Sequence, residues 1–409
     1  MNRSLIVLYA AVCLDAVGIG LVFPILPRLI EDVTHTSNVA PQLGVMASLY
    51  AVMQFAFAPV LGALSDKIGR RAVLLLSLLG AVVNYLVMAT ASTLPLLLLG
   101  RALTGATSAN VSVATAYLTD VSVPEERPRR FGLSSAMFGV GFIIGPILGG
   151  VLGDKWLRLP FVVAAALNTL NLLLALFLLP ESRPPTRQKI ALAVLNPLRP
   201  LRFLLESRAI LPFVIVFFLL SGAGEAYGTC WALWGSATFQ WSSRAVGFSL
   251  GTFGVCQTLV QAFLPGPASK LFGERRALLV GLMCASVGLF VMAFARQGWL
   301  IFAVMPLFAL GGIGVPALQA SATRLVNPTR QGELQGVIAS VVSLASIVAP
   351  LGFSTFYFLV QQDWPGAVWL AVVVVQGIAV SVVLAGNRTG ARAPSERIET
   401  AKPSNVVQQ

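Results

Sequence analysis

The stretch from Gly62 to Arg71 reads GALSDKIGRR, and the chain repeats its plan from Gly266 to Arg275 as GPASKLFGER. The two stretches are 204 residues apart. The same offset relates two further pairs of residues, which are Gly132 with Gly336 and Pro146 with Pro350. One offset that holds in separate regions predicts a chain built from two parallel repeats, an arrangement in which one half can rock against the other.

The composition indicates that lipid, and not water, surrounds most of this chain. Of its 409 residues, 56% are hydrophobic and only 11% are charged, whereas a soluble domain carries roughly 25% charged residues. Backbone groups in hydrocarbon must be paired within their own segment, so a spanning helix needs about 20 apolar residues. Twelve apolar runs of this kind lie at 5–28, 44–64, 72–91, 94–118, 132–154, 159–180, 210–233, 246–269, 276–296, 299–320, 333–358 and 364–386.

These runs predict an all-α membrane protein with twelve transmembrane helices in two pseudo-symmetric six-helix bundles. The longest connector separates six runs from six, and the chain after the last run is polar. We therefore expect four parts, which are an N-terminal bundle over 1–180, a cytoplasmic linker over 181–209, a C-terminal bundle over 210–386 and a disordered cytoplasmic tail over 387–409.

The basic residues predict how the chain lies in the membrane. If the N-terminus is cytoplasmic, 22 of the 28 Lys and Arg residues fall in cytoplasmic segments, which is the bias that membrane proteins show. We therefore expect both termini to be cytoplasmic. The same distribution explains the net charge of +12 without a nucleic-acid partner, because the basic residues are not interleaved with aromatic residues on one face.

The sequence offers no support for an enzyme or a metal centre. It has no Gly-rich nucleotide loop, no nucleophile elbow and no cluster of metal ligands, and its single histidine, His35, lies in a polar connector. The four cysteines lie in apolar runs without paired spacing, so we expect free thiols. We expect no cofactor, and an ion gradient in place of ATP as the source of energy.

Two glycine patterns have a physical meaning of their own. Gly62 and Gly69 permit a tight turn between closely packed helix ends, where the neighbouring arginines can pair with carboxylates of other helices. Gly141, Gly145 and Gly149 recur every four residues, so they form one smooth face where a second backbone can approach. The plain alternatives are ordinary cytoplasmic charge for the first pattern and simple helix packing for the second.

Together these patterns resemble the Major Facilitator Superfamily, and within it the tetracycline-efflux group of drug–proton antiporters. The resemblance also rests on LDAVGIGL at 14–21, APVLGALSD at 58–66, GERRA at 273–277, GGIGVPALQ at 311–319 and RQGELQG at 330–336. It spans nearly the whole chain. It implies the major facilitator fold and export of small organic molecules by alternating access, driven by protons.

The resemblance implies roles for the two glycine patterns. The first is similar to the loop that acts in this family as a cytoplasmic latch of the outward-facing state, and the second to the antiporter motif that marks exporters. The expected latch comprises Gly62, Asp66, Lys67, Gly69, Arg70, Arg71 and Asp120. The expected antiporter motif comprises Gly141, Gly145, Pro146, Gly149 and Gly150.

Three charged residues fall inside apolar runs, where charge is costly and therefore points to function. Asp15 lies in the first run, Arg101 in the fourth and Glu225 in the seventh. Burial favours the protonated form of a carboxyl group, and a nearby arginine favours the charged form again. We expect proton coupling at these residues. The alternatives are a static buried pair of Asp15 with Arg101, and a structural role for Glu225.

Polar uncharged residues in the runs are candidates for substrate contact, although each could equally bond two helices. The expected set is Gln54, Asn84, Asn110, Gln257, Gln261 and Gln319. The chain departs from the tetracycline pumps at three positions, since Asn84 and Ala285 stand where that group has acidic residues and Gln257 where it has histidine. These departures place tetracycline itself in question, and we expect Glu225 to replace a lost carboxylate.

The favoured interpretation is a proton-coupled antiporter that exports tetracycline-like or other amphipathic drugs across a bacterial inner membrane. An uptake symporter or facilitator of the same fold is the alternative, and a receptor or scaffold is disfavoured by the charges within the membrane. The expected partners are a small-molecule substrate, protons and the lipid bilayer, with no nucleic acid, and the expected state is a monomer.

Overall fold

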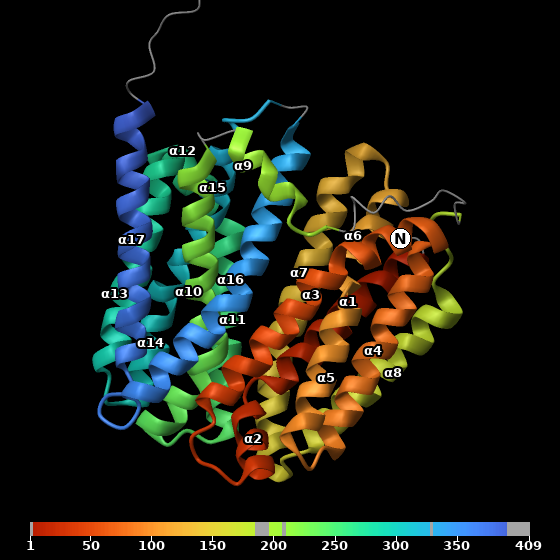
Figure 1. Ribbon diagram of the computed structural model, residues 1–409, viewed down its shortest axis with the longest axis horizontal. Helices are drawn as coiled ribbons and strands as arrows, with labels where there is room; N and C mark the ends of the chain where they lie inside the picture. Colours follow the sequence, from red (N-terminus) through yellow and green to blue (C-terminus); the bar gives the residue numbers. More distant parts are fainter. Residues whose placement is uncertain (1–2, 185–195, 207–209, 328–329, 391–409) are drawn as a thin grey trace, which may run out of the picture.

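The computed structural model describes residues 3–184, 196–206, 210–327 and 330–390, and its regular structure there consists of helices only. The helices form two groups that lie side by side (Figure 1). Both ends of the described chain lie at one end of the molecule, which we call the terminal face. The opposite end, where α2 lies in Figure 1, is called the far face.

The N-terminal half packs its helices around two apolar clusters, one near each face. Its long helices are rich in Leu, Val and Ala and contain few charged residues. They are α1 (Arg3–Val22), α2 (Leu26–Thr34), α3 (Ala40–Ile68), α4 (Arg70–Thr90), α5 (Leu94–Thr107), α6 (Asn110–Asp120), α7 (Arg127–Lys155) and α8 (Leu159–Leu178).

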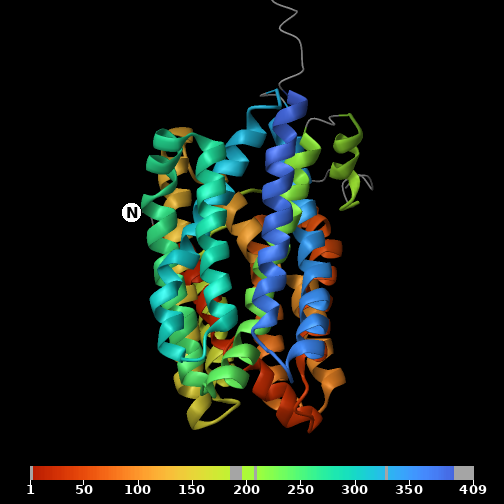
Figure 2. The same ribbon diagram turned by 90° about the vertical axis from the view of Figure 1, so that its left-hand side faces the viewer.

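The C-terminal half follows a linker that includes the short helix α9 (Phe203–Glu206). Its helices run between the two faces (Figure 2). They are α10 (Leu211–Phe239), α11 (Ser243–Phe263), α12 (Pro265–Phe272), α13 (Glu274–Phe294), α14 (Gly298–Ala309), the 3-10 turn η5 (Leu310–Ile313), α15 (Gly314–Thr323), α16 (Gln331–Val360) and α17 (Ala367–Gly390).

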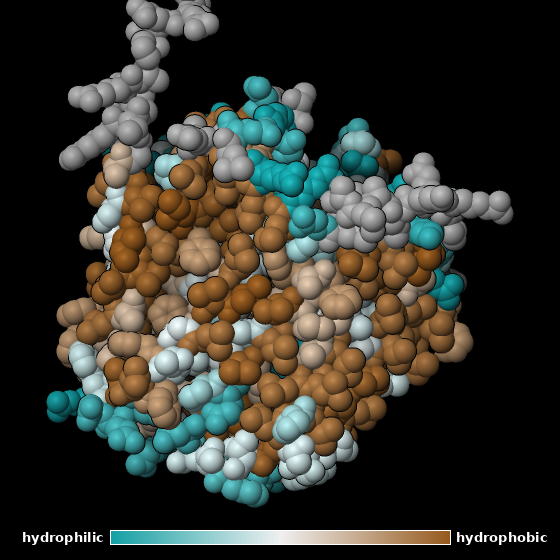
Figure 3. Space-filling view, viewed as in Figure 1, coloured by the Kyte–Doolittle hydropathy of each residue, from teal (hydrophilic) through white to brown (hydrophobic). Residues whose placement is uncertain are grey.

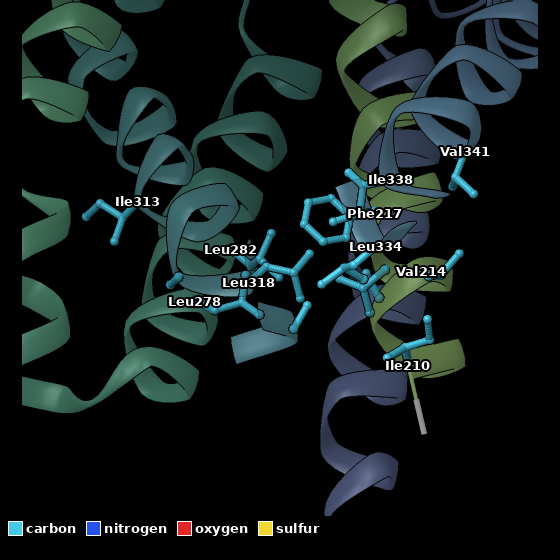
Figure 4. Close-up of a cluster of buried hydrophobic side chains, with 14 of the residues drawn as sticks. Ile210, Val214, Phe217, Leu278, Leu282, Ile313, Leu318, Leu334, Ile338 and Val341 are labelled. Carbon is cyan, nitrogen blue, oxygen red and sulfur yellow. The ribbon is translucent and has the colours of Figure 1, made fainter. Parts of the chain in front are cut away.

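One of the two apolar clusters of the C-terminal half joins α10, α13, α15 and α16. In Figure 4, Phe217 of α10 and Leu334 of α16 lie together, and Leu278 of α13 lies beside Leu318 of α15. These side chains are at most 4% exposed. Lipid offers no hydrophobic drive between helices, so such close packing is what holds the bundle together.

The offset of 204 residues read from the sequence also relates the helices. The bounds of α13 follow those of α4 by 204 residues at both ends. Gly69 and Gly273, the residues before these two helices, have φ of 105° and 76°, which favours glycine because a side chain is strained there. The predicted sequence repeat is therefore also a structural repeat, with matching helix ends and turns at these positions.

Eleven helices in the described residues are long and apolar enough to cross a membrane, and the expected fourth span is the exception. It is divided into α5 and α6 at Ser108 and Ala109. The matching position of the C-terminal half falls in η5, where the helix tightens without stopping. The fourth helix of each half is thus irregular at the same depth, and no proline marks the break in α5–α6.

The first expected span, 5–28, is also shorter than predicted. α1 ends at Val22 and α2 starts at Leu26 after a turn. Pro24 lies in that turn, where its ring would clash with the carbonyl four residues earlier in a continued helix. At the other end of the chain, α17 continues to Gly390, past the expected boundary at 386. The rest of the expected tail, 391–409, lies outside the described residues.

The surface between the two faces is apolar, as a bilayer requires. Figure 3 shows a broad hydrophobic belt with hydrophilic residues at the two faces. Large apolar side chains such as Phe177, Leu271 and Leu359 are exposed, and a contiguous apolar surface of this size marks contact with a membrane. The chain is thus a multi-pass membrane protein.

The two halves touch mainly near the far face. In α7 every buried residue lies between Gly141 and Gly153, and none of residues 127–140 is buried. On the other side of the molecule, the Ser48 hydroxyl of α3 donates to the Ile347 carbonyl of α16 at 2.6 Å. In Figure 1 the two groups of helices diverge toward the terminal face. This conformation is therefore closed at the far face and open at the terminal face.

Candidate transport site

Asp15 is the buried carboxylate of the N-terminal half. It lies in the middle of α1 and is 8% exposed. The Asn110 side-chain amide donates a hydrogen bond of 2.9 Å to its Oδ1. Asn110 is the first residue of α6, so the break in the fourth span is what brings this amide to the carboxylate.

The break itself is held by polar side chains of α3. The hydroxyl groups of Tyr50 and Ser108 are 2.8 Å apart, and Gln54 Nε2 donates to Ser108 Oγ at 3.1 Å. Gln54 and Asn110, two residues expected to contact substrate, therefore lie on the two sides of the same break. A membrane tolerates an irregular helix when polar side chains supply the hydrogen bonds that the break leaves unmade.

A small cavity opens onto this carboxylate. Its wall includes Asp15, Asn110, Leu8, Leu74 and Phe138, and Asp15 is the one charged residue among all those that line it. The remaining wall residues are apolar. A carboxylate with one hydrogen-bond donor in an apolar wall can exchange a proton with little competition from other groups.

Arg101 does not pair with Asp15 in this conformation. Within the described residues, no carboxylate oxygen lies within 4.0 Å of the Arg101 guanidinium, and its Nε is buried without a hydrogen-bond partner. A buried guanidinium nitrogen without a hydrogen-bond partner is costly. The expected pairing with Asp15 thus stays a prediction for another state of the molecule.

Glu225 is the membrane carboxylate of the C-terminal half. It lies on α10 and is half-buried, and its Oε1 accepts a hydrogen bond of 2.5 Å from the Ser346 hydroxyl of α16. No ion pair of Glu225 occurs within the described part of the chain. The structure thus places Asp15 and Glu225 in different halves, each held by one neutral donor.

Two of the three departures from the tetracycline pumps meet at one place. The Gln257 amide lies against Gly312, where an added Cβ would be 2.5 Å from Gln257 Nε2. Ala285 lies against Gly311, where an added Cβ would be 2.9 Å from the Ala285 Cβ. Both residues therefore flank η5, the irregular turn of the C-terminal half.

The other expected substrate residues are scattered. Asn84 is 3% exposed, and its Oδ1 lies near Gly100 of α5 without a hydrogen-bond partner in the described chain, so it lies inside the N-terminal bundle. Gln261 is exposed on α11. Gln319 is exposed on α15, and its Nε2 donates to Gln335 Oε1 of α16 at 3.1 Å.

The loop between α3 and α4 forms a network of charges at the terminal face. Arg70 pairs with Asp66 at 2.6 Å and with Asp120 at 3.2 Å, and so joins three helices. Lys67 is exposed. The Arg71 guanidinium donates to the Leu176 carbonyl of α8. A Cβ added at Gly62 would meet no atom within 4 Å.

One member of this network was missed in the sequence. Glu181, just after α8, accepts hydrogen bonds from the backbone amides of Arg70 and Arg71 at 2.8 and 3.1 Å. It thereby caps the start of α4, where unpaired amides and the helix dipole favour negative charge. The nearby Arg183 pairs with Asp66 at 3.1 Å. Only the position of Glu181 at the end of an apolar run could have suggested this role.

The glycines of α7 bring it into close contact with α1. Cβ atoms added at Gly141, Gly145 and Gly149 would lie 2.4, 2.7 and 2.2 Å from carbonyl oxygens of α1. Real Cβ atoms do not come so close, and backbone cannot give way easily. Gly150 faces the other half instead, since its Cβ would lie 2.3 Å from the Ser243 carbonyl oxygen of α11. Pro146 lies between these contacts and is buried.

Comparison with known proteins agrees with this picture. The profile described as the Major Facilitator Superfamily matches residues 8–230 and 224–408. The tetracycline resistance protein, class C, of Escherichia coli is 46% identical over 90% of this chain and 93% of its own length. The class G protein of Vibrio anguillarum is 40% identical over 94% of this chain and 98% of its own.

Among solved structures, the nucleoside transporter NupG has a similar fold. It aligns with a TM-score of 0.79 over 94% of this chain and 100% of its own, at 13% identity. Identity this low bears on the fold alone.

Proposed function

Because the chain belongs to the Major Facilitator Superfamily and to its tetracycline-resistance group, we propose that it exports amphipathic organic molecules and takes up protons in exchange. Membership confirms the family, the fold and the class of drug–proton antiporter that the motifs predicted. A transporter of this family is not an enzyme. The substrate, the residues that carry protons and the orientation in the membrane belong to the proposal.

The observation that carries the proposal is the Asp15–Asn110 contact at the wall of an apolar cavity. A coupled exporter needs one group whose charge changes within the membrane and whose surroundings depend on which face is open. Asp15 meets the first condition because it is the one charged residue of that wall. It meets the second because Asn110 starts a helix that is broken from α5.

The terminal face corresponds to the cytoplasm in this proposal. The described end of the linker at α9 lies there (Figure 1), and so do the charged residues of the loop between α3 and α4, in keeping with the usual bias of bacterial inner-membrane proteins. The open terminal face then makes this an inward-facing state, in which Asp15 releases its proton to the cytoplasm and the site can receive substrate. Closure of that face and opening of the far face would complete the cycle.

Arg101 and Glu225 have supporting roles in the proposal. An Arg101 guanidinium that reaches Asp15 in the other state would favour the charged carboxylate there. Glu225 sits in the C-terminal half with only the Ser346 hydroxyl as partner, so it can carry a second proton or replace a carboxylate that the chain lacks at Asn84 and Ala285. Neither role requires a bound cofactor.

The substrate in this proposal is amphipathic, and its contacts are polar but uncharged. Gln54 and Asn110 flank the break in the N-terminal half, and Gln257 of α11 lies against the irregular turn of the C-terminal half. Gln261 and Gln319 are exposed, whereas Asn84 can act only through its neighbours because it is buried. A pocket of this kind suits many drugs. We further infer a monomer in a bacterial inner membrane.

Drug accumulation in cells tests the proposal. Cells that express the protein should accumulate less tetracycline or less of another drug in a panel than cells that express Asp15→Asn. A protonophore should remove the difference. Lower accumulation that persists with the protonophore, or that Asp15→Asn retains in full, would contradict proton coupling at Asp15. Higher accumulation in cells with the wild-type chain would favour uptake.

A further inference from the structure

The helices α7 and α11 pack against each other in an antiparallel register that can be followed from residue to residue. Cβ atoms added to four glycines would each lie within 3.0 Å of the facing helix. These contacts pair Gly150 with Ser243, Gly247 with Pro146, Gly251 with Ile147 and Gly254 with Ile143. As the contacts proceed along α11 from Ser243 to Gly254, they proceed along α7 in the opposite sequence direction, from Gly150 to Ile143.

The contact ends before the helices do. A Cβ at Gly139 would still lie 3.5 Å from Thr258 Oγ1. Beyond that point, Cβ atoms at Gly132 of α7 and Gly266 of α12 would meet nothing within 4 Å. Glycine in a membrane helix is typical of a surface where a second backbone comes close, yet these two have no such neighbour in this state.

The register shows which residues would meet if the contact continued. From the Gly254–Ile143 contact, Gly266 is twelve residues onward and Gly132 is eleven back. Lys270 is sixteen residues onward and Glu126 is seventeen back. The register is therefore kept within one residue, and it brings glycine opposite glycine, and a lysine near the end of α12 opposite a glutamate directly before α7.

We propose that closing of the terminal face joins α7 to α12 through a Gly132–Gly266 contact and a Glu126–Lys270 ion pair. The proposal rests on the alternation between two open faces that the proposed function requires. It adds a second latch, in the C-terminal half, to the loop between α3 and α4. The two surfaces belong to one chain, so the partner of each surface is known.

The present contacts of the charged residues leave them able to change partners. Lys270 is exposed and has no ion pair within the described residues, and the Glu126 carboxylate, directly before α7, pairs there with Arg130. Arg127 and Arg130 donate to backbone carbonyls of the turn before α7, so both already have partners close to their own helix. A lysine that approaches would thus meet Glu126 first.

The repeat supports the proposal independently. An offset of 204 residues relates Lys270 to Asp66 and Glu126 to Arg330, and the sign of the charge is inverted in both pairs. The contact that matches Glu126–Lys270 in the repeat is Asp66 with Arg330, and it too joins opposite charges. Gly62 and Gly336 hold the corresponding glycine positions, each eighteen residues from the close Gly44–Ser354 contact of α3 and α16.

The signs of the charges are also inverted in a neighbouring ion pair of each half. Arg70 pairs with Asp120 at 3.2 Å in the N-terminal half, and Glu274 pairs with Arg324 at 2.6 Å in the C-terminal half. These four residues are related by the same offset with opposite signs. Each half therefore has an ion pair at this position, with the signs of the two charges exchanged.

Chemical cross-linking tests the contact directly. In membrane vesicles, the Glu126→Cys/Lys270→Cys chain should be joined by a short bifunctional thiol reagent. The joined chain should no longer transport, and a reductant that cleaves the reagent should restore it. The matched control is Glu126→Cys/Arg276→Cys, because Arg276 is exposed at the same face but lies six residues further along. That control should stay unjoined, as should the chain with its native cysteines alone.

Charge exchange tests the ion pair. Lys270→Glu and Glu126→Lys should each lower export about threefold to tenfold, and the double exchange should return it to within about twofold of wild type. Arg276→Glu makes the same charge change nearby and should have little effect. The proposal would be overturned if the double exchange lowered export by as much as the two single losses combined. It would also be overturned if the bifunctional reagent never cross-linked the Glu126→Cys/Lys270→Cys chain. Cross-linking needs neither substrate nor gradient, so this result is independent of the exported compound.

Discussion

In the N-terminal half, Asp15 and Asn110 form a buried hydrogen bond, whereas the matching positions of the C-terminal half are Leu219 and Gly314. Arg101 likewise matches Met305. The helices α4, α5, α6 and α7 start 204 residues before α13, α14, α15 and α16, so much of the scaffold is duplicated while the polar site is not. In the proposed cycle, proton exchange would therefore depend first on the N-terminal half.

The glycines show the same asymmetry in packing. Gly145 and Gly149, which touch the backbone of α1, are matched by Ala349 and Phe353 in the C-terminal half. The C-terminal half instead has a cluster of aromatic rings near the far face, in which Trp231 contacts Trp234 and Trp369. At these matched positions the N-terminal half thus packs backbone against backbone, whereas the C-terminal half has larger side chains.

Removal of the Asn110 amide, which only the N-terminal half has at this position, should have the largest effect on export. Asn110→Ala leaves Asp15 without its hydrogen bond, and a bond to a charged group contributes about 1.5–3 kcal/mol. Export should fall about tenfold or more, measured as the initial rate of drug efflux from loaded cells. Asn168→Ala is the control, because that amide donates to its own helix at the Ala164 carbonyl. Equal rates in both variants would argue against a special role for Asn110.

A methyl group added at Gly149 should have the second-largest effect, and it should act by lowering the stability of the folded protein. Its Cβ would lie 2.2 Å from the Leu21 carbonyl oxygen, and overpacking of this kind costs about 1–3 kcal/mol. Gly149→Ala should lower the melting temperature of the purified protein in detergent. Gly352→Ala, where the added Cβ meets nothing within 4 Å, should leave it almost unchanged. If both variants melt alike, close packing of α7 on α1 is not what stabilises the N-terminal half.

The carboxylate of the C-terminal half should matter less than that of the N-terminal half. Glu225→Gln keeps the shape of the side chain and its hydrogen bond to Ser346 but cannot exchange a proton. We expect a loss of a few-fold, roughly 1 kcal/mol, in proton-driven export, with folding preserved. Ser346→Ala should have a smaller effect. Normal transport by Glu225→Gln with unchanged proton dependence would leave Glu225 with a structural role only.

The smallest effect is expected at the irregular turn of the C-terminal half. Gln257→His restores the residue of the tetracycline pumps beside Gly312 and should shift preference toward tetracycline by about twofold to tenfold relative to other exported drugs. The readout is the ratio of two drug resistances in the same cells. A proportional change in both resistances would mean that Gln257 acts on the cycle and not on selection.

Composition and repeats predicted most of this fold because they report on the length and burial of helices. The bounds of α4 and α13 differ by at most two residues from the expected runs. The break between α5 and α6 was not predicted, because Ser108 carries no helix-breaking signal of its own. It depends on Tyr50 and Gln54 of another helix, and such tertiary contacts outweigh local propensity.

The candidate site was predicted only in its residue types. Asp15 was identified because charge is rare in apolar runs, but Asn110 and not Arg101 is its partner in this conformation. Glu181 escaped notice because its partners, the amides of Arg70 and Arg71, are more than a hundred residues away. Sequence patterns locate costly residues, whereas the choice among polar partners requires the three-dimensional structure.

Proton movement in proteoliposomes tests the central claim most directly. The purified protein is reconstituted with a pH-sensitive dye inside the vesicles, and an exported drug is added on one side without a pH gradient. Movement of the drug should drive protons the opposite way in the wild type, and Asp15→Asn should show no proton signal. Protons that move in the same direction as the drug, or a full signal from Asp15→Asn, would contradict antiport through this carboxylate.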